Sequence, residues 1–219
     1  MKRLAPRALA VVLALLAVPA SAATLHGFTP RLEALALLQT LNADLLSHDS
    51  ATAVLQGWCD DHRLAPGAKM AAKLVRGADK PLPEAARALI GDAPVRYRRV
   101  QLSCGRRILS EADNWYRPDP LTPEMNRLLD ETDTPFGVAV RDLAFRRRNL
   151  SAELLFRPLP RGWENGPRPQ GAVPVPAEVL RHAAILTTGA GVPFSYVVET
   201  YSGSVLDITP AHRTAPSRP

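Results

Sequence analysis

Residues 95–104 read VRYRRVQLSC and residues 107–116 read RILSEADNWY, with Gly105-Arg106 between them. Successive side chains of an extended chain point to opposite faces, so Val100, Leu102 and Cys104 share one face of the first segment. The other face carries mostly polar side chains: Tyr97, Arg99, Gln101 and Ser103. Because a two-residue connection suits adjacent antiparallel strands, the two segments are predicted to form a β-hairpin.

Helices dominate the chain before this hairpin. Leucines recur at helical spacing in the first of them, and Asp49 or Ser50 can cap the second. The predicted segments are helices over 30–47 and 51–61, a strand over 69–76, and a connector over 80–94 with a short helix at 83–89.

The chain after the hairpin alternates between helices and strands. Thr122-Pro123-Glu124 has the residues that favour a helix start: a capping threonine, proline at the first position and an acid in the first turn. The predicted segments are a helix over 122–131, a loop over 133–137 leading into a short helix that ends at Leu143, and strands over 145–155, 185–188 and 193–201. Residues 158–177 hold six prolines and three glycines, which predicts an exposed excursion.

Together these segments predict an α+β fold, with a single antiparallel sheet and helices inserted between hairpins. Residues 23–208 are long enough for one domain with a core and short for two. The tail, residues 209–219, is predicted to be disordered.

The first 22 residues have the composition of a secretory signal peptide. Lys2, Arg3 and Arg7 precede an apolar run over residues 8–18, and Ala20-Ser21-Ala22 offers small residues for cleavage. The alternatives are an uncleaved anchor or a misplaced start codon. The run is about half of the roughly 20 residues that span a bilayer, so the mature protein is expected to be exported, periplasmic or secreted, without stable membrane insertion.

Charge and cysteine content exclude some functions and leave others open. The formal net charge of +6 includes three basic residues of the leader, and only 5% of residues are aromatic, so nucleic-acid binding is not expected. Cys59 and Cys104 can form a disulfide in an oxidising compartment, but two separate buried thiols are the favoured interpretation. No metal site is expected. The five histidines are scattered and are interpreted as solvated surface residues.

Two charges inside predicted strands are the main candidates for chemistry. Arg99 and Glu199 each lie mid-strand, where an outward-facing surface residue is the plainer interpretation. As a pair in one sheet they would form two polar anchors, because arginine can grip a carboxylate through two hydrogen bonds and glutamate can accept one from a hydroxyl. The implied ligand is a flat acid with a hydroxyl at its far end.

Four stretches in this order resemble the chorismate lyase family. They are Leu45-Leu46-Ser47-His48-Asp49-Ser50-Ala51-Thr52, Arg98-Arg99-Val100-Gln101-Leu102-Ser103-Cys104, Leu121-Thr122-Pro123-Glu124 with Thr134-Pro135-Phe136-Gly137, and Gly191-Val192-Pro193 with Val197-Val198-Glu199. Their order and spacing agree with the family from about residue 31 to 205, apart from the proline-rich insertion.

The resemblance implies a site and an activity. Arg99 would bind the ring carboxylate and Glu199 the 4-hydroxyl, while backbone N–H groups at Ala51 and Phe136 would meet the ligand carboxylate. The activity would be elimination of pyruvate from chorismate to give 4-hydroxybenzoate, without cofactor or metal. The alternative is an exported, non-catalytic binding module for a small aromatic carboxylate. In both cases the protein is expected to be a monomer, with Arg99 and Glu199 in one cavity of roughly 300 Å³ or more.

Chorismate carries a second carboxylate, which calls for a second cation. The strand after the hairpin turn instead reads Ser110-Glu111-Ala112-Asp113, which is acidic. The candidates to compensate are Arg98, Arg141 and Arg157.

Overall fold

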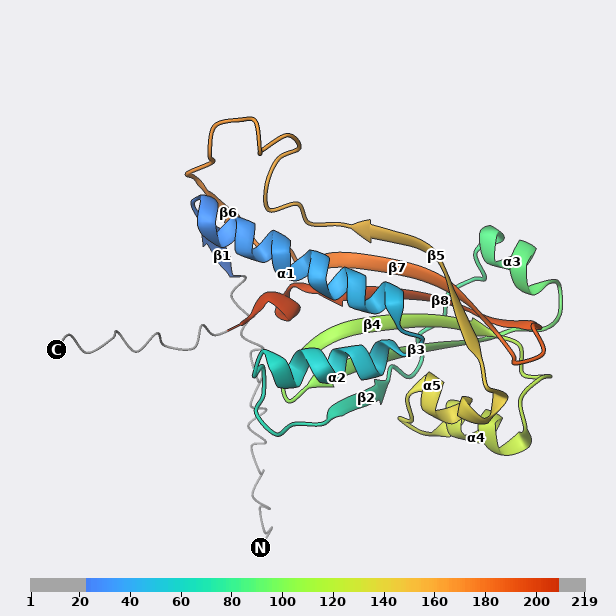
Figure 1. Cartoon of the computed structure of the whole chain (residues 1–219). Helices are drawn as coiled ribbons and strands as arrows, with labels where there is room; N and C mark the ends of the chain where they lie inside the picture. Colours follow the sequence, from blue (N-terminus) through green and yellow to red (C-terminus); the bar gives the residue numbers. More distant parts are fainter. Residues whose placement is uncertain (1–22, 209–219) are drawn as a thin grey trace, which may run out of the picture.

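The structure, a computed structural model, describes residues 23–208, and these confirm the α+β class. A six-stranded antiparallel sheet has the strand order β2-β3-β4-β8-β7-β5, with helices over its faces and one end (Figure 1). The predicted signal peptide (1–22) and disordered tail (209–219) lie outside the described residues.

The elements follow the predicted order closely. The helices are α1 (Phe28–Ser47), α2 (Ala51–Asp61), α3 (Glu84–Ile90), α4 (Pro123–Glu131) and α5 (Phe136–Ala139), with short 3-10 turns at Arg141–Leu143 and Gly203–Leu206. The strands are β1 (Thr24–His26), β2 (Met70–Leu74), β3 (Arg96–Cys104), β4 (Arg107–Tyr116), β5 (Arg146–Leu154), β6 (Ala172–Pro174), β7 (Glu178–Thr187) and β8 (Pro193–Ser202).

The main core lies between the sheet and the helices α1 and α2, which run across one of its faces (Figure 1). Leu38, Leu41 and Leu45 of α1 are almost fully buried, as their helical spacing predicts. The side chain of Ser50 caps α2 by accepting a hydrogen bond from the N–H of Ala53 at 3.3 Å. This cap fixes where α2 begins, directly above the sheet.

A second apolar cluster closes one end of the sheet beneath α4 and α5. The side chain of Thr122 caps α4 by accepting from the N–H of Met125 at 3.2 Å, with Pro123 at the first helical position. Phe136, the first residue of α5, packs between Tyr116 and Phe194. The start of α5 is thereby held against the same sheet face that α2 covers.

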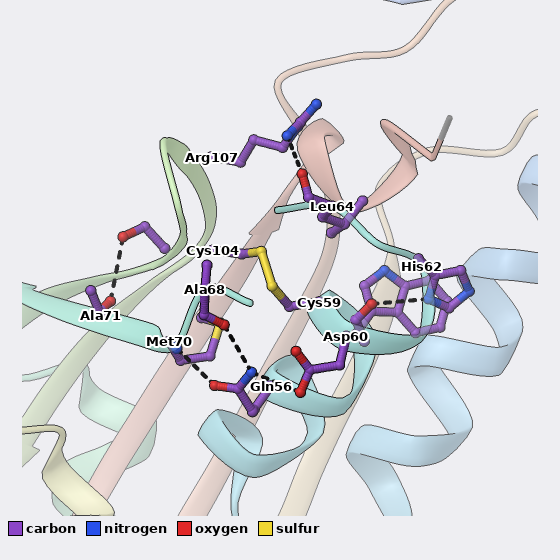
Figure 2. The surroundings of a disulfide bond; sticks show 12 residues. Gln56, Cys59, Asp60, His62, Leu64, Ala68, Met70, Ala71, Cys104 and Arg107 are labelled. Carbon is purple, nitrogen blue, oxygen red and sulfur yellow. Dashed lines mark hydrogen bonds between the residues drawn. A yellow bond between two sulfur atoms is a disulfide. The ribbon is translucent and has the colours of Figure 1, made fainter. Parts of the chain in front are cut away.

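A disulfide joins Cys59 of α2 to Cys104 at the end of β3 (Figure 2). The favoured interpretation of two separate thiols was therefore wrong, because α2 lies directly on β3 and brings the two side chains together. Gln56 adds a second tie nearby: it donates to the carbonyl of Ala68 at 3.2 Å and accepts from the N–H of Met70 at 2.8 Å (Figure 2). The C-terminal half of α2 is thus fixed to the sheet.

Two features differ from the sequence prediction. β1 and β6 form an additional two-stranded sheet, which was missed because three-residue strands carry no readable periodicity. β7 begins at Glu178 rather than 185, because Arg181 and His182 interrupt its apolar pattern. Arg181 lies on the open sheet face, whereas His182 is fully buried. None of the helices within residues 23–208 is long and apolar enough to cross a bilayer.

Candidate ligand-binding site

A cavity of about 60 Å³ lies between the sheet, the start of α2 and the start of α5. Its floor is made of side chains from the central strands, and its walls come from the segments 49–52 and 135–137. The charged and polar residues that line it are Asp49, Ser50, Thr52, Arg98, Asn114, Arg147 and Glu199. The cavity is therefore an apolar space with a few polar groups, which is the usual composition of a small-molecule site.

Arg98 is a buried cation without an anionic partner. Only 3% of the residue is exposed, and it forms no ion pair within residues 23–208. Its Nε donates to the carbonyl of Leu129 at 2.8 Å, and its Nη2 donates to those of Thr132 and Thr134 at 3.1 and 2.7 Å. Nη1 is buried without any hydrogen-bond partner in the described structure. Burial lowers the pKa of this guanidinium.

Arg147 and Glu199 form a buried ion pair at the opposite side of the cavity. Nη2 of Arg147 lies 2.6 Å from Oε2 of Glu199, and the two side chains are 5% and 10% exposed. The hydroxyl of Tyr201 also donates to Oε2, at 3.1 Å. Burial alone would lower the pKa of Arg147, but the Glu199 carboxylate outweighs that effect and raises it. Oε1 of Glu199 accepts no hydrogen bond from the described residues.

The strand register fixes the separation between the two charged regions. Arg98 pairs with Asn114, which pairs with Val197, and Glu199 lies two residues further along the same strand. All four residues therefore face the cavity side of the sheet. Two strand spacings across and two residues along give roughly 12 Å between the Cα atoms of Arg98 and Glu199. A molecule of one ring or a short chain can reach from one to the other.

Asn114 is a site residue that the sequence analysis missed. Its Oδ1 accepts a hydrogen bond from the hydroxyl of Ser195 at 2.9 Å, which orients the amide. The amide nitrogen is then available as a donor beside Arg98. The sequence contained a usable signal, because Asn114 is a polar residue at a core-facing position directly opposite Arg98.

The structure overturns the assignment of Arg99 to the cavity. Arg99 lies on the opposite face of the sheet, so the prediction that Arg99 and Glu199 share one cavity was wrong. Its Nε and Nη2 bind Asp113 at 2.7 and 3.1 Å, and its Nη1 lies 3.2 Å from Glu111. The physical reason is strand alternation, which puts Arg98 in phase with Val100 and leaves Arg99 on the polar face. Glu199, Ala51 and Phe136 do line the cavity.

The acidic residues of β4 also face away from the cavity. Glu111 and Asp113 lie on the Arg99 side, while Ala112 and Asn114 line the cavity. Among the proposed compensating cations, Arg98 lines the cavity, whereas Arg141 and Arg157 do not. The second cation at the cavity is Arg147, and Glu199 already neutralises it.

Asp113 is the centre of a polar network on the open sheet face. Besides Arg99, it accepts from Lys80 at 2.6 Å and from the hydroxyl of Tyr97 at 2.5 Å. Burial alone would raise the pKa of Asp113, but the hydrogen bonds from Arg99, Lys80 and Tyr97 outweigh burial and lower it to about 2. This network stabilises the hairpin and does not contact the cavity.

We expect Asp113 to make stability depend on pH in acid. Its pKa is lowered on folding, so its contribution is complete above about pH 4 and is lost as the pH falls towards 2. The size of this contribution is about 2 kcal/mol. Urea unfolding of the wild type and Asp113→Asn between pH 2 and 7 should show a stability difference that shrinks below pH 4. Asp92→Asn, which replaces an exposed acid, is the control. An equal difference in the free energy of unfolding between the wild type and Asp113→Asn at pH 2 and at pH 6 would contradict the role given to Asp113.

The cavity is smaller than the predicted 300 Å³. A volume of about 60 Å³ holds about four water molecules. A ring-sized guest therefore requires the walls at 49–52 or 135–137 to move outward. The Cys59–Cys104 disulfide fixes the C-terminal half of α2 covalently. The loop before the helix start is held to the sheet by weaker contacts, such as the hydrogen bond from the N–H of Arg147 to Asp49.

His182 corrects another expectation, since it is not a solvated surface residue. It is fully buried, and its Nε2 lies 2.8 Å from Oδ1 of Asn42 on α1. Burial lowers its pKa and favours the neutral ring, outweighing the Glu199 carboxylate, which acts in the opposite direction. Within residues 23–208, no three His, Cys, Asp or Glu side chains come together in an arrangement that would hold a metal ion.

The fold and site define a class of protein: an α+β domain with a small cavity on one sheet face, a buried unpaired arginine at one side and a glutamate at the other. The chain is 52% identical over 185 residues to uncharacterized protein y4mC of Sinorhizobium fredii, covering 81% of this chain and 78% of that protein. It therefore belongs to the same family as y4mC. No protein-family model matches the chain.

The comparison with solved structures found partial likenesses. The effector domain of PhnF from Mycobacterium smegmatis is 14% identical with a TM-score of 0.46, covering 71% of this chain and 89% of that domain. The ligand-binding domain described for a GntR-family transcriptional regulator of Bordetella bronchiseptica is 15% identical with a TM-score of 0.40, covering 63% and 86%. YydK of Bacillus subtilis, described as a possible transcriptional regulator, is 18% identical with a TM-score of 0.38. The likeness covers 62% of this chain and 58% of YydK.

Proposed function

We propose that the protein binds a small organic acid in the cavity beneath α2 and α5, with the acid's carboxylate on Arg98. One observation carries this proposal: among the described residues, a guanidinium that is 3% exposed has no anionic partner and keeps one nitrogen unbonded. Burying an unpaired charge is costly. A carboxylate guest would supply both the missing charge and the missing hydrogen-bond acceptor.

The surroundings of Arg98 suit a carboxylate. The Asn114 amide lies on the neighbouring strand, opposite Arg98. Ala51 and Thr52 open α2 and line the cavity, and the N–H groups of a first helical turn favour anions. At the far side, the free Oε1 of Glu199 can accept from a hydroxyl of the guest. These contacts would place the guest as the family resemblance implies, with its carboxylate on an arginine and its hydroxyl on Glu199.

Chorismate pyruvate-lyase activity is the second candidate. The cavity side of β4 carries no acidic group, which removes one objection to it. In this reaction the bond between the ring carbon and the enolpyruvyl oxygen breaks, and the ring carbon that bears the hydroxyl loses a proton, which makes the ring aromatic. The departing enolpyruvate takes up a proton and leaves as pyruvate. The protein's part would be to orient the substrate and exclude water. Chorismate is a dianion, however, and the second cation of the cavity is already paired with Glu199.

We also infer that the protein is exported after removal of residues 1–22. The disulfide between Cys59 and Cys104 supports this, because such bonds persist in oxidising compartments. Mass spectrometry of the chain recovered from outside the cytoplasm should give an N-terminus at Ala23. An intact N-terminus at Met1 on cytoplasmic protein would contradict export.

The proposed function is tested by titrating the mature chain with 4-hydroxybenzoate and with chorismate in a calorimeter. Saturable binding of 4-hydroxybenzoate with one site per chain is expected. Parallel incubation with chorismate, followed by absorbance of 4-hydroxybenzoate, separates the two candidates. Turnover would establish the lyase, and binding without turnover would establish the binding module. No saturable binding of either compound would contradict both.

A further inference from the structure

We propose that Arg147 determines what the ligand carries at the end away from Arg98: a neutral hydrogen-bond donor and not a second acid. This inference rests on the proposed function and deepens it. Nothing in the sequence patterns pointed to Arg147, which belongs to the run Arg146-Arg147-Arg148 on the edge strand β5.

Arg147 is held in place from several directions. Its Nε donates to Oδ1 of Asn149 at 2.9 Å, while Nη2 donates to Glu199 at 2.6 Å. Its backbone N–H donates to Oδ1 of Asp49 at 3.1 Å, which connects β5 to the loop before α2. The guanidinium is therefore directed at Glu199 by its own strand and by the cavity wall.

The buried charges of the cavity add up to one positive charge. Arg98 and Arg147 are cations and Glu199 is the anion. Asp49 also lines the cavity, but it is exposed, so solvent screens its charge. A guest with a single carboxylate restores neutrality. A guest with a second carboxylate would bury it against Glu199, and like charges in contact are strongly unfavourable.

Glu199 offers one carboxylate oxygen to the guest. Arg147 and Tyr201 occupy Oε2, which leaves Oε1 as the atom open to the guest. An ionised carboxylate has no proton to donate, so it recognises a hydroxyl and not another acceptor. A site built to accept from a hydroxyl discriminates strongly against analogues that lack it.

A charge exchange at Glu199 tests this inference. Glu199→Gln keeps the shape of the side chain and releases the charge of Arg147 into the cavity. The probes are benzoate, 4-hydroxybenzoate, terephthalate and 4-nitrobenzoate. The nitro group of 4-nitrobenzoate has the shape of the second carboxylate of terephthalate but no net charge, so this probe is a monoanion of matched shape. In the wild type, 4-hydroxybenzoate should bind best and terephthalate no better than 4-nitrobenzoate. In Glu199→Gln, the affinity for terephthalate relative to 4-nitrobenzoate should rise at least about tenfold.

The double variant Arg147→Gln/Glu199→Gln is the matched control. Replacing both members of a buried ion pair is often tolerated, so this variant should fold. It should lose the gain for terephthalate, and its preference for 4-hydroxybenzoate over benzoate should fall to about twofold or less. An unchanged terephthalate ratio in Glu199→Gln, or a gain that survives in the double variant, would overturn the role of Arg147. Failure of the wild type to bind any of the four probes would instead contradict the proposed function.

Discussion

Arg98→Met is expected to weaken the binding of a small carboxylate roughly 30-fold or more, since loss of one partner of a buried charged hydrogen bond costs about 2–5 kcal/mol. The guanidinium is the buried cation that lacks an anion in the described structure, and its Nη1 is unbonded. Isothermal titration with 4-hydroxybenzoate measures the loss. Arg99→Gln is the matched control, because Arg99 lies on the opposite face of the sheet. This variant should bind 4-hydroxybenzoate with the affinity of the wild type.

Arg98→Met also affects the stability of the fold. Arg98 donates to the carbonyls of Leu129, Thr132 and Thr134, and buried carbonyls left without a donor cost about 1–3 kcal/mol each. Removing a buried charge offsets part of that cost. If Arg98→Met does not fold, the role of Arg98 can be tested in the wild type by changing the ligand. Benzoate should bind at least about 30 times more tightly than benzamide, which lacks the negative charge. Equal affinity for the two would contradict the role of Arg98.

Replacing both cysteines, as Cys59→Ala/Cys104→Ala, should lower the free energy of unfolding by about 4 kcal/mol. Chain-entropy arguments give this value for a loop of this length, with a sequence separation of 45. The loss is a large fraction of the roughly 5–15 kcal/mol that stabilises a typical domain. Urea unfolding of the variant and the wild type measures it.

Reduction supplies the control for this prediction. Dithiothreitol should destabilise the wild type by a similar amount and leave the double variant unchanged. Titration of thiols in the denatured, unreduced wild type should find none. Two free thiols, together with no effect of the reductant, would show that the bond does not form.

Much of the fold follows from local sequence signals. The leucine spacing of α1, the Ser50 and Thr122 caps and the alternation in β3 predicted elements that the structure contains within a few residues. The strand β7 shows the limit of periodicity. His182 is buried against Asn42, a contact between residues 140 positions apart that no local pattern contains.

The candidate site was predicted only in part, and the error has a simple cause. Arg98 and Arg99 are adjacent, so one residue of register decides which of them faces the cavity. The alternation already placed Arg98 with Val100 and Leu102, which identifies it as the buried member. Arg147 was beyond reach, because its pairing with Glu199 depends on the order of β5, β7 and β8 in the sheet.

The most direct test of the account is a crystal structure of the mature protein with 4-hydroxybenzoate. We predict the carboxylate within hydrogen-bond distance of Nη1 of Arg98 and the hydroxyl on Glu199, with the segment 49–52 or 135–137 displaced outward. A ligand bound on the sheet face of Arg99, or an unchanged cavity with the ligand elsewhere, would contradict it.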